Sequence, residues 1–193
     1  MIDLSKYFNT ELDQHKDVLN LTKQSIEPQF IELVECCKNS IEVGGKLIFF
    51  GNGGSAADAQ HLSTELTVKF SKERDPIPAI ALTTDTSTLT AIGNDFGFEK
   101  IFSRQIQALG RPNDVVIAIS TSGKSQNVIE AVKAAKSMGI KVVAFTGMSG
   151  DKLIEISDIG IKIPSNTVSR VQEMHITIGQ MLCNALEKHL GLV

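Results

Sequence analysis

The sequence predicts an α/β protein built on a parallel sheet with helices on both faces. Short, continuously apolar segments alternate along the chain with segments whose apolar residues recur at helical spacing. Continuously apolar strands are typical of strands buried on both faces, as in a parallel sheet. The 193 residues are 42% hydrophobic and 21% charged, a balance that suits one globular domain over residues 1–193.

The individual elements follow from the same pattern. The predicted strands are 46–50, 77–84, 114–120, 141–147 and 159–164. The predicted helices are 3–22, 27–43, 54–72, 122–139 and 167–190, with a helical or irregular stretch over 86–109. Pro28 suits the first turn of the second helix, and Gly44 and Gly45 end it. Residues 1–44 are therefore expected to form N-terminal helices that pack on the core.

Composition excludes several classes of protein. A net charge of −3 gives no sign of the basic surface that binds nucleic acid. No apolar run approaches the roughly 20 residues of a membrane span. Cys36, Cys37 and Cys183 have no metal-ligand spacing and are expected to be buried thiols of a reducing compartment. The N-terminal segment MIDLSKYFNTELDQHK lacks an apolar signal core. We expect a soluble, cytoplasmic protein with neither nucleic acid nor membrane as a partner.

The segment GNGGSA (51–56) ends the first predicted strand and begins a helix. Such a glycine turn presents backbone N–H groups and a helix N-terminus to an anion. It fits the loose dinucleotide pattern, but no acidic residue follows at the expected distance of about 20 residues. Three interpretations stay open: a nucleotide site, a phosphate site, or a tight corner without a ligand. The hydroxyl group of Ser55 favours phosphate.

The segment STSGKS (120–125) follows the third predicted strand and also begins a helix. It ends like a P-loop, but Ala118 stands where the full pattern requires glycine. Its hydroxyl groups belong to Ser120, Thr121, Ser122 and Ser125. The alternative role, capping the helix, needs only one of them. Hydroxyls combined with helix N–H groups predict a neutral cradle for a sugar phosphate, beyond the carboxyl end of a strand where parallel sheets bind ligands.

Two polar side chains share one face of the helix that follows the first turn. His61 and Glu65 are spaced i, i+4, so they can bind a metal or act in acid–base chemistry. The alternative is a hydrogen bond at the surface. The neighbouring anion-binding turn favours a functional role.

The last predicted helix carries Gln172, His175 and Gln180. Gln172 and Gln180 share a stripe, but helical rise separates them by about 12 Å along the axis. If both line one site, we expect different subunits to supply them. His175 lies about 60° around the helix from Gln172 and is a candidate for a buried, hydrogen-bonded histidine.

The segment GNDFGF (93–98) predicts a turn inside the stretch 86–109. There, Asn94 and Asp95 either hold sugar hydroxyls or only form the turn.

Together these segments resemble the sugar isomerase (SIS) domain family, and within it the bacterial isomerases of heptose phosphates. The resemblance covers nearly the whole chain and is carried by GNGGSAADAQH (51–61), ELT (65–67), AIGNDFGFEKIFSRQ (91–105), ISTSGKSQNV (119–128) and RVQEMHI (170–176). It implies a three-layer sandwich with a five-stranded parallel sheet, and a homotetramer with the N-terminal helices and the sites at subunit contacts. It also implies conversion of sedoheptulose 7-phosphate to D-glycero-D-manno-heptose 7-phosphate, toward nucleotide-activated heptoses of surface polysaccharides such as lipopolysaccharide.

The resemblance also implies the role of each site residue. The substrate-binding residues would be Asn52, Gly53, Gly54, Ser55, Glu65, Asn94, Asp95, Ser120, Thr121, Ser122, Ser125 and Gln172. His61, Glu65 and Gln172 match ligands of one zinc ion per subunit, and Gln180 stands at the position of the fourth ligand. Glu65 also matches the catalytic base, and Gln180 takes the place of the second acid–base group.

Three positions depart from the family pattern. Gln180 replaces a histidine, Lys69 replaces an arginine and Ser169 replaces an aspartate. An amide cannot exchange a proton near pH 7, although its carbonyl oxygen can ligate a metal weakly. The changes indicate a shifted substrate, a weakened enzyme or an altered sequence.

Three alternative functions stay open. One is a non-catalytic SIS tetramer that binds a replication initiator, but that relative lacks the glutamate that this chain has at Glu65. Another is a sugar-phosphate sensor, which needs only the phosphate cradle. A third is isomerisation of another phosphosugar, such as a pentose phosphate. The retained carboxylate favours an enzyme, an aldose–ketose isomerase.

Overall fold

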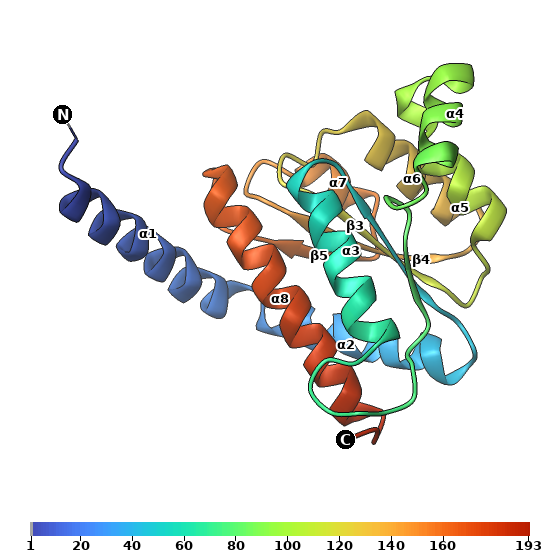
Figure 1. Cartoon of the computed structure of the whole chain (residues 1–193), viewed down its shortest axis with the longest axis horizontal. Helices are drawn as coiled ribbons and strands as arrows, with labels where there is room; N and C mark the ends of the chain where they lie inside the picture. The colour runs from blue at the N-terminus through green and yellow to red at the C-terminus, as the bar shows by residue number, and fades with distance from the viewer. Residues whose placement is uncertain (1) are drawn as a thin grey trace.

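The structure, a computed structural model, describes residues 2–193 (Figure 1). Within these residues the sheet consists of β1 (Leu47–Gly51), β2 (Ala79–Ala81), β3 (Val115–Ser120), β4 (Lys141–Thr146) and β5 (Ile159–Lys162). Every neighbouring pair is parallel, and the strand order is β2-β1-β3-β4-β5. The predicted five-stranded parallel sheet is confirmed.

Helices cover both faces of the sheet and complete the three-layer sandwich. One face is covered by α2 (Glu27–Glu42), α3 (Gly54–Thr67) and α8 (Val168–His189), while α1 (Leu4–Ser25) projects from the body (Figure 1). The other face carries α4 (Thr86–Phe96), the 3-10 helix η1 (Phe98–Lys100), α5 (Ser103–Leu109), α6 (Gln126–Ser137) and α7 (Asp151–Glu155).

Alternate residues of each central strand point to opposite faces of the sheet. Both faces are buried, which explains why the strand sequences are continuously apolar. In β1, Leu47 and Phe49 belong to the core beneath α2, α3 and α8. Ile48 and Phe50 belong to the core beneath α4, α5 and α6. All four side chains are fully buried, so β1 contributes to both cores.

Some predicted boundaries are wrong, and the causes are local. The edge strand β2 is shorter than the predicted 77–84, because it pairs on one side only and Pro78 precedes it. Helix α3 ends at Thr67 and not at residue 72, since the following loop is bound to Glu187 of α8. The stretch 86–109 resolves into α4, η1 and α5, and α7 was not predicted. The expected burial of the cysteines holds for Cys37 and Cys183, whereas Cys36 is partly exposed.

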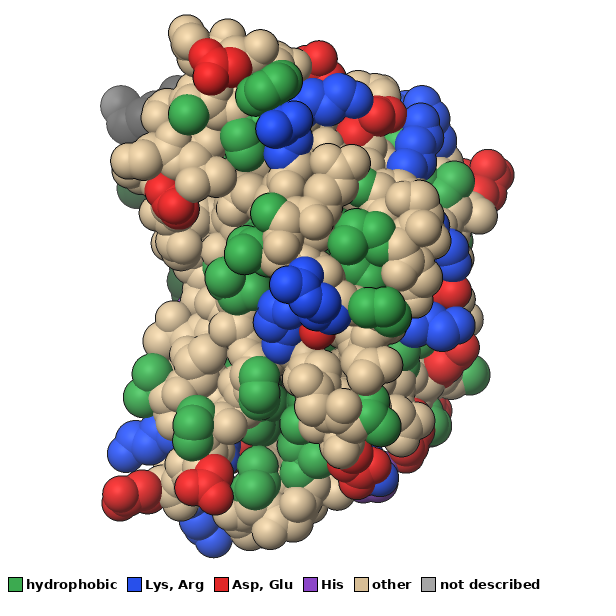
Figure 2. All heavy atoms as spheres, turned by 90° about the vertical axis from the view of Figure 1, so that its right-hand side faces the viewer, with side chains coloured by type: hydrophobic (Ala, Val, Ile, Leu, Met, Phe, Trp, Pro, Cys, Tyr) green, Lys and Arg blue, Asp and Glu red, His purple; other side chains and the backbone are tan. Residues whose placement is uncertain are grey.

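Charged side chains of both signs are mixed over the side of the molecule on which α4 and α5 lie (Figure 2). Lys100 and Lys133, for example, both pair with Glu130, at 3.0 and 3.1 Å. Within residues 2–193, no helix has the length and apolar character needed to cross a membrane.

Helix α1 is held to α8 by charged residues of the RVQEMHI segment. Arg170 is buried and pairs with Glu173 at 2.6 Å and with Glu11 of α1 at 3.3 Å. His15 of α1 lies 2.8 Å from Glu173. These contacts give Arg170 and Glu173 a role in docking α1.

Helices α3 and α8 approach closely because glycines occur at their contact. A Cβ on Gly179 would lie 2.5 Å from Cδ1 of Leu62, which is itself buried. A Cβ on Gly54 would lie 2.4 Å from Nε2 of Gln172. The two glycines therefore determine how near α8 lies to α3.

Replacement of Gly179 by alanine is expected to destabilise the fold by about 1 kcal/mol. Alanine favours a helix over glycine by about 0.5–1 kcal/mol, but overpacking a closed core costs about 1–3 kcal/mol. Gly93→Ala in α4 is the matched control and is expected to stabilise, because its Cβ would meet only Ile101, at 4.0 Å. Urea unfolding followed by circular dichroism measures both, and equal stabilisation of the two variants would contradict the close packing of α3 on α8.

Candidate active site

The two glycine- and hydroxyl-containing turns lie side by side at the carboxyl edge of the sheet. They follow β1 and β3, which are hydrogen-bonded neighbours with Gly51 opposite Ile119. The chain turns in opposite directions from these two strands, so the turns meet at the topological switch point, where open α/β sheets bind ligands. The predicted placement of both turns is confirmed.

The first turn is shaped by glycines that leave its backbone accessible. A Cβ on Gly51 would lie 2.6 Å from the carbonyl oxygen of Ile119, so only glycine fits between the strands. Gly53 adopts φ 56° and ψ −122°, a conformation that side-chain-bearing residues rarely adopt. No side chain within residues 2–193 caps the N-terminus of α3. The N–H groups of Ser55, Ala56 and Ala57 bond to the carbonyl oxygens of Asn52 and Gly53, so within residues 2–193 the Gly54 N–H is the one in the first turn of α3 that stays available to an anion.

The second turn keeps its hydroxyls free of helix capping. Ser125 is the N-cap residue of α6, yet its side chain makes no capping hydrogen bond. Its Oγ lies 3.4 Å from Oγ of the buried Ser120. Oγ of Ser122 accepts a hydrogen bond from the N–H of Lys124 at 3.2 Å, so it shapes the turn. The capping interpretation fails for Ser125, which supports the phosphate cradle.

A pair of asparagines connects the two turns. Asn52 and Asn127 exchange two side-chain hydrogen bonds, of 2.9 and 2.8 Å. Asn127 was not predicted as a site residue; the available signal was an amide in the first turn of the helix that follows the turn 120–125. A cavity of about 400 Å³ beside the pair is lined by Asn52, Phe98, Glu99, Ser125, Gln126 and Asn127.

His61, Glu65 and Gln180 converge on one another where α3 meets α8. Nε2 of His61 lies 3.0 Å from Oε1 of Glu65 and 2.6 Å from Nε2 of Gln180. The imidazole nitrogen cannot donate to Glu65 and accept from Gln180 at once. A flip of the Gln180 amide removes this conflict, because its oxygen then faces the imidazole. In that orientation the imidazole, the carboxylate and the amide oxygen can also supply lone pairs to a divalent cation. The donor set therefore fits a metal ion.

Gln172 lies elsewhere on α8. Its amide packs against Gly54 at the N-terminus of α3, beside the first turn. Within residues 2–193 no hydrogen bond joins it to His61 or Glu65. The structure thus brings three of the four predicted ligands together in one chain, and places Gln172 by the predicted substrate turn.

Asn94 and Asp95 lie in the last turn of α4, and not in a turn within an irregular stretch. The helix continues through them because the break comes at Gly97, where φ is 89°. Both side chains are exposed, and Nδ2 of Asn94 donates to Oδ1 of Asp95 at 2.7 Å. No hydrogen bond within residues 2–193 joins this pair to the two turns.

The buried histidine on α8 lacks the hydrogen bonds expected of it. His175 is 1% exposed, packs against Phe145 with ring centroids 5.7 Å apart, and has no partner for either ring nitrogen within residues 2–193. Burial lowers the pKa of His175 to about 4, so the ring stays neutral near pH 7. It faces the sheet and is poorly placed to carry protons at Gln180.

A second titratable group lies on α3 one turn before His61. Asp58 is partly buried, and its Oδ2 has no hydrogen-bond partner within residues 2–193. Burial raises the pKa of Asp58 to about 6, although the nearby His61 lowers it. Asp58 is therefore a second carboxyl group on α3, and burial disfavours its charged form.

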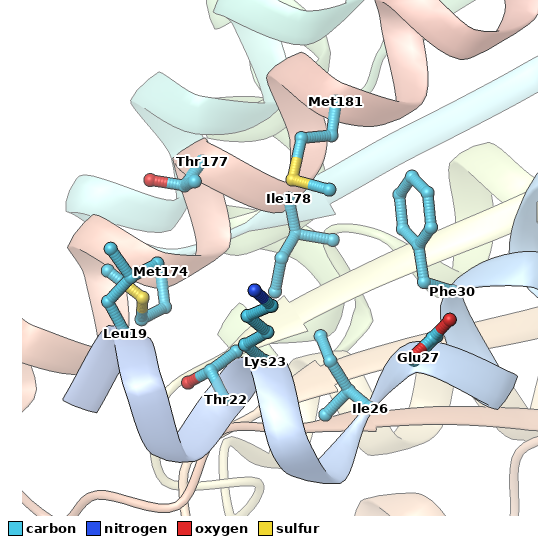
Figure 3. Close-up of a pocket in the computed structure, with 10 residues that line it drawn as sticks. All are labelled: Leu19, Thr22, Lys23, Ile26, Glu27, Phe30, Met174, Thr177, Ile178 and Met181. Atoms are coloured by element: carbon cyan, nitrogen blue, oxygen red, sulfur yellow. The ribbon is translucent and has the colours of Figure 1, made fainter. Parts of the chain in front are cut away.

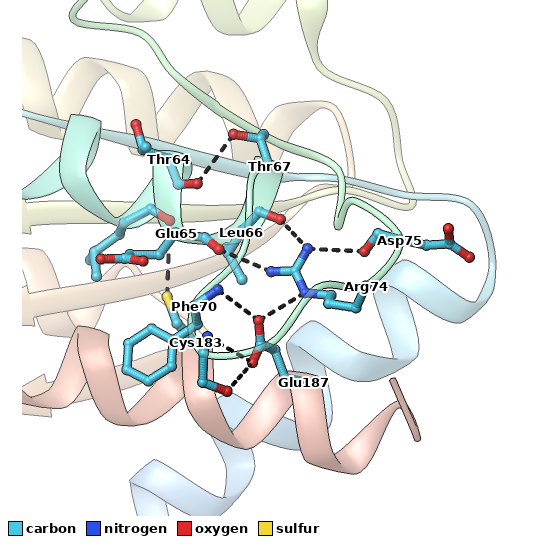
Figure 4. A network of polar contacts seen from close by, with 11 residues as sticks. Thr64, Glu65, Leu66, Thr67, Phe70, Arg74, Asp75, Cys183 and Glu187 are labelled. Atoms are coloured by element: carbon cyan, nitrogen blue, oxygen red, sulfur yellow. Dashed lines mark hydrogen bonds and ion pairs between the residues drawn. The ribbon is translucent and has the colours of Figure 1, made fainter. Parts of the chain in front are cut away.

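A buried ion pair anchors the end of α3 that carries Glu65 (Figure 4). Nε of Arg74 lies 2.8 Å from Oε1 of Glu187, and both side chains are almost fully buried. Arg74 also donates to the carbonyl oxygens of Glu65 and Leu66, at 2.9 and 2.7 Å. Burial alone would raise the pKa of the Glu187 carboxyl, but donors including the N–H of Phe70 hold it below its usual value. Arg74, held by Glu187, thus donates to backbone carbonyls that the end of α3 leaves without helical partners.

Comparisons with known proteins identify the family of this chain. The sequence matches the SIS domain family over residues 11–147. Phosphoheptose isomerase from Paramagnetospirillum magneticum is 49% identical over 181 residues, which cover 94% of each chain. The structure of phosphoheptose isomerase from Neisseria gonorrhoeae has a TM-score of 0.91 and 38% identity, covering 96% of this chain and all of the other. That from Francisella tularensis has a TM-score of 0.93 and 35% identity, with 97% and 100% covered.

The fold and the two-turn site define a member of the SIS-domain proteins, since the family match spans most of the chain. Sequence identity close to one half over nearly the full length identifies the group within this family. The chain belongs to the phosphoheptose isomerases.

Proposed function

We propose that this chain interconverts sedoheptulose 7-phosphate and D-glycero-D-manno-heptose 7-phosphate. One observation carries the proposal: the hydroxyl-rich turn after β3 lies beside the uncapped N-terminus of α3, and the same helix carries Glu65. Adjacent elements thereby supply a binding site for the phosphate of the substrate and an acid–base group. Membership of the phosphoheptose isomerases supports the heptose as substrate.

The phosphate end of the substrate would be held by hydroxyls and backbone N–H groups. Ser120 and Ser125 face one another, and the N-terminus of α6, where the N–H groups of Gln126 and Asn127 have no hydrogen-bond partner within residues 2–193, lies at the same edge of the sheet. Binding energy from this remote group positions the reacting end of the sugar.

Glu65 would act as the base that moves the carbon-bound proton. It removes the proton from the carbon next to the carbonyl, which leaves an enediol, and returns it to the adjacent carbon. A second proton must pass between the two oxygens. Gln180 cannot carry it, and His175 is buried against Phe145, so water is the expected carrier.

A zinc ion belongs to this proposal. Its ligands would be His61, Glu65 and Gln180, which converge around one nitrogen, and Gln172 if a subunit contact or a rotamer change brings it near. When bound, zinc would polarise the substrate carbonyl.

Replacement of Glu65 by glutamine is expected to lower kcat at least about 100-fold, because acid–base catalysis contributes about 10²–10⁴-fold. The assay incubates the protein with sedoheptulose 7-phosphate and detects the aldoheptose by chromatography. Glu73→Gln, at an exposed carboxylate in the loop after α3, is the control. A small loss in Glu65→Gln would exclude Glu65 as base. A wild-type protein that binds the sugar phosphate without converting it would favour a sensor or a binding protein.

Replacement of Gln180 by histidine is expected to raise kcat by at least about tenfold and to increase the zinc content of the purified protein. Imidazole titrates near neutral pH and is a stronger zinc ligand than an amide. Elemental mass spectrometry and the heptose assay measure the two effects. Gln180→Asn, which keeps the amide on a shorter side chain, should gain neither. Unchanged zinc and unchanged rate in Gln180→His would refute the proposed role of this position.

A homotetramer with subunit contacts through the N-terminal helices is also part of the proposal. Leu4, Phe8 and Leu12 form an exposed apolar stripe on α1, with exposures of 71%, 61% and 53%. A cavity of about 400 Å³ between α1, α2 and α8 is lined mainly by apolar side chains (Figure 3). Apolar surface of this extent is typical of a protein interface, and a second copy of this chain supplies a matching apolar stripe.

The assembly predicts a mass of about four chains of 20.9 kDa in sedimentation equilibrium. Phe8→Glu is expected to reduce this mass, because burying a charge in an apolar contact is unfavourable. Thr10→Glu, at an exposed position outside the stripe, is the control and should leave the mass unchanged. A monomeric wild-type protein would rule out the tetramer.

A further inference from the structure

We propose that Asn127 is a positioning residue for the active site, because its side chain holds the turn after β1 against the phosphate turn after β3. The inference rests on the proposed function and adds a residue to which that function gives no role. Asn127 lies in the first turn of α6, 75 residues from its partner Asn52.

The two side chains form a closed pair of amide hydrogen bonds. Nδ2 of Asn52 donates to Oδ1 of Asn127 at 2.9 Å, and Nδ2 of Asn127 donates to Oδ1 of Asn52 at 2.8 Å. Oδ1 of Asn127 also accepts the N–H of Val128 at 2.9 Å, which fixes the orientation of its amide. Asn127 is only 3% exposed, so its hydrogen bonds are shielded from water.

This pair is the side-chain connection between the turns. Within residues 2–193, no other side-chain hydrogen bond joins residues 52–55 to residues 120–127. Asn52 in turn holds the start of α3, since its carbonyl oxygen accepts the N–H of Ser55 at 3.0 Å. A shift of Asn127 would therefore move the first turn relative to the phosphate cradle.

The pairing also determines what Asn52 can offer a substrate. A primary amide has two N–H donors and two oxygen lone pairs. The pair with Asn127 uses one N–H donor and one oxygen lone pair of Asn52. Asn52 therefore retains one donor and one acceptor in a fixed direction. Groups that are oriented in advance contribute to rate because misplacement by about 1 Å can cost about 100-fold.

A double-mutant cycle tests the inference. Asn127→Ala and Asn52→Ala are each expected to lower kcat for the heptose phosphate about 10-fold to 100-fold, and the double variant should fall no further than the worse single one. Inorganic phosphate probes the cradle alone, and its inhibition constant should stay within about twofold of wild type in Asn127→Ala. A purely structural role in α6 would instead weaken phosphate binding together with turnover.

Matched variants keep the result interpretable. Asn127→Asp preserves the acceptor for the N–H of Val128 but cannot donate to Asn52; it should fold and should still lose kcat. Asn113→Ala, at the opposite edge of the sheet, is the control and should leave kcat unchanged. Additive losses in the cycle, or near-wild-type kcat in both Asn127 variants, would overturn the inference alone. A wild-type protein without turnover would overturn the proposed function and, with it, this role.

Discussion

The parallel pairing of β1 with β3 is the constraint on which the site depends. Gly51 at the end of β1 lies opposite Ile119, and a Cβ there would strike the Ile119 carbonyl oxygen. β1 and β3 can therefore stay paired up to the point where each strand ends and its turn begins. Because the two turns begin side by side, the N-terminus of α6 and the Gly54 N–H of α3 lie at one edge of the sheet. In the proposed function, the hydroxyl groups and N–H groups of the turn after β3 would hold the substrate phosphate.

The second wall of the site depends on how α8 lies against α3. Glycines at 54 and 179 let the helices approach, and the buried Arg74–Glu187 pair ties α8 to the carbonyl ends of α3. The contact is thus supported at both ends and along its length. Packing and satisfied carbonyls thereby position Glu65, whose carboxylate lies 3.0 Å from Nε2 of His61. Such support from neighbouring elements is what a precisely placed acid–base group requires.

Gln180 limits the acid–base chemistry that this site can perform. Overall identity shows the phosphoheptose isomerase family, yet one side chain decides whether a proton can pass through this position. An amide at 2.6 Å from His61 can orient the imidazole or ligate a metal, but it cannot exchange a proton near neutral pH. The burial of His175 removes the nearest alternative on α8. In the proposed reaction, water is therefore the expected carrier of the proton between the sugar oxygens.

The sequence alone determined the five strands and the longer helices in chain order, the common edge at which the two turns lie, and the i, i+4 pair of His61 and Glu65. These features are local, because periodicity and glycine turns act over a few residues. The predicted ends of α3 and β2 and the predicted turn at Asn94 were wrong. The loop bound to Glu187 decides where α3 ends, and the position of β2 at the edge of the sheet decides its length. Only the tertiary structure brought Asn127 to Asn52 and Gln180 to His61. Contacts between residues 75 or 119 positions apart depend on strand register and helix packing, which no local pattern encodes.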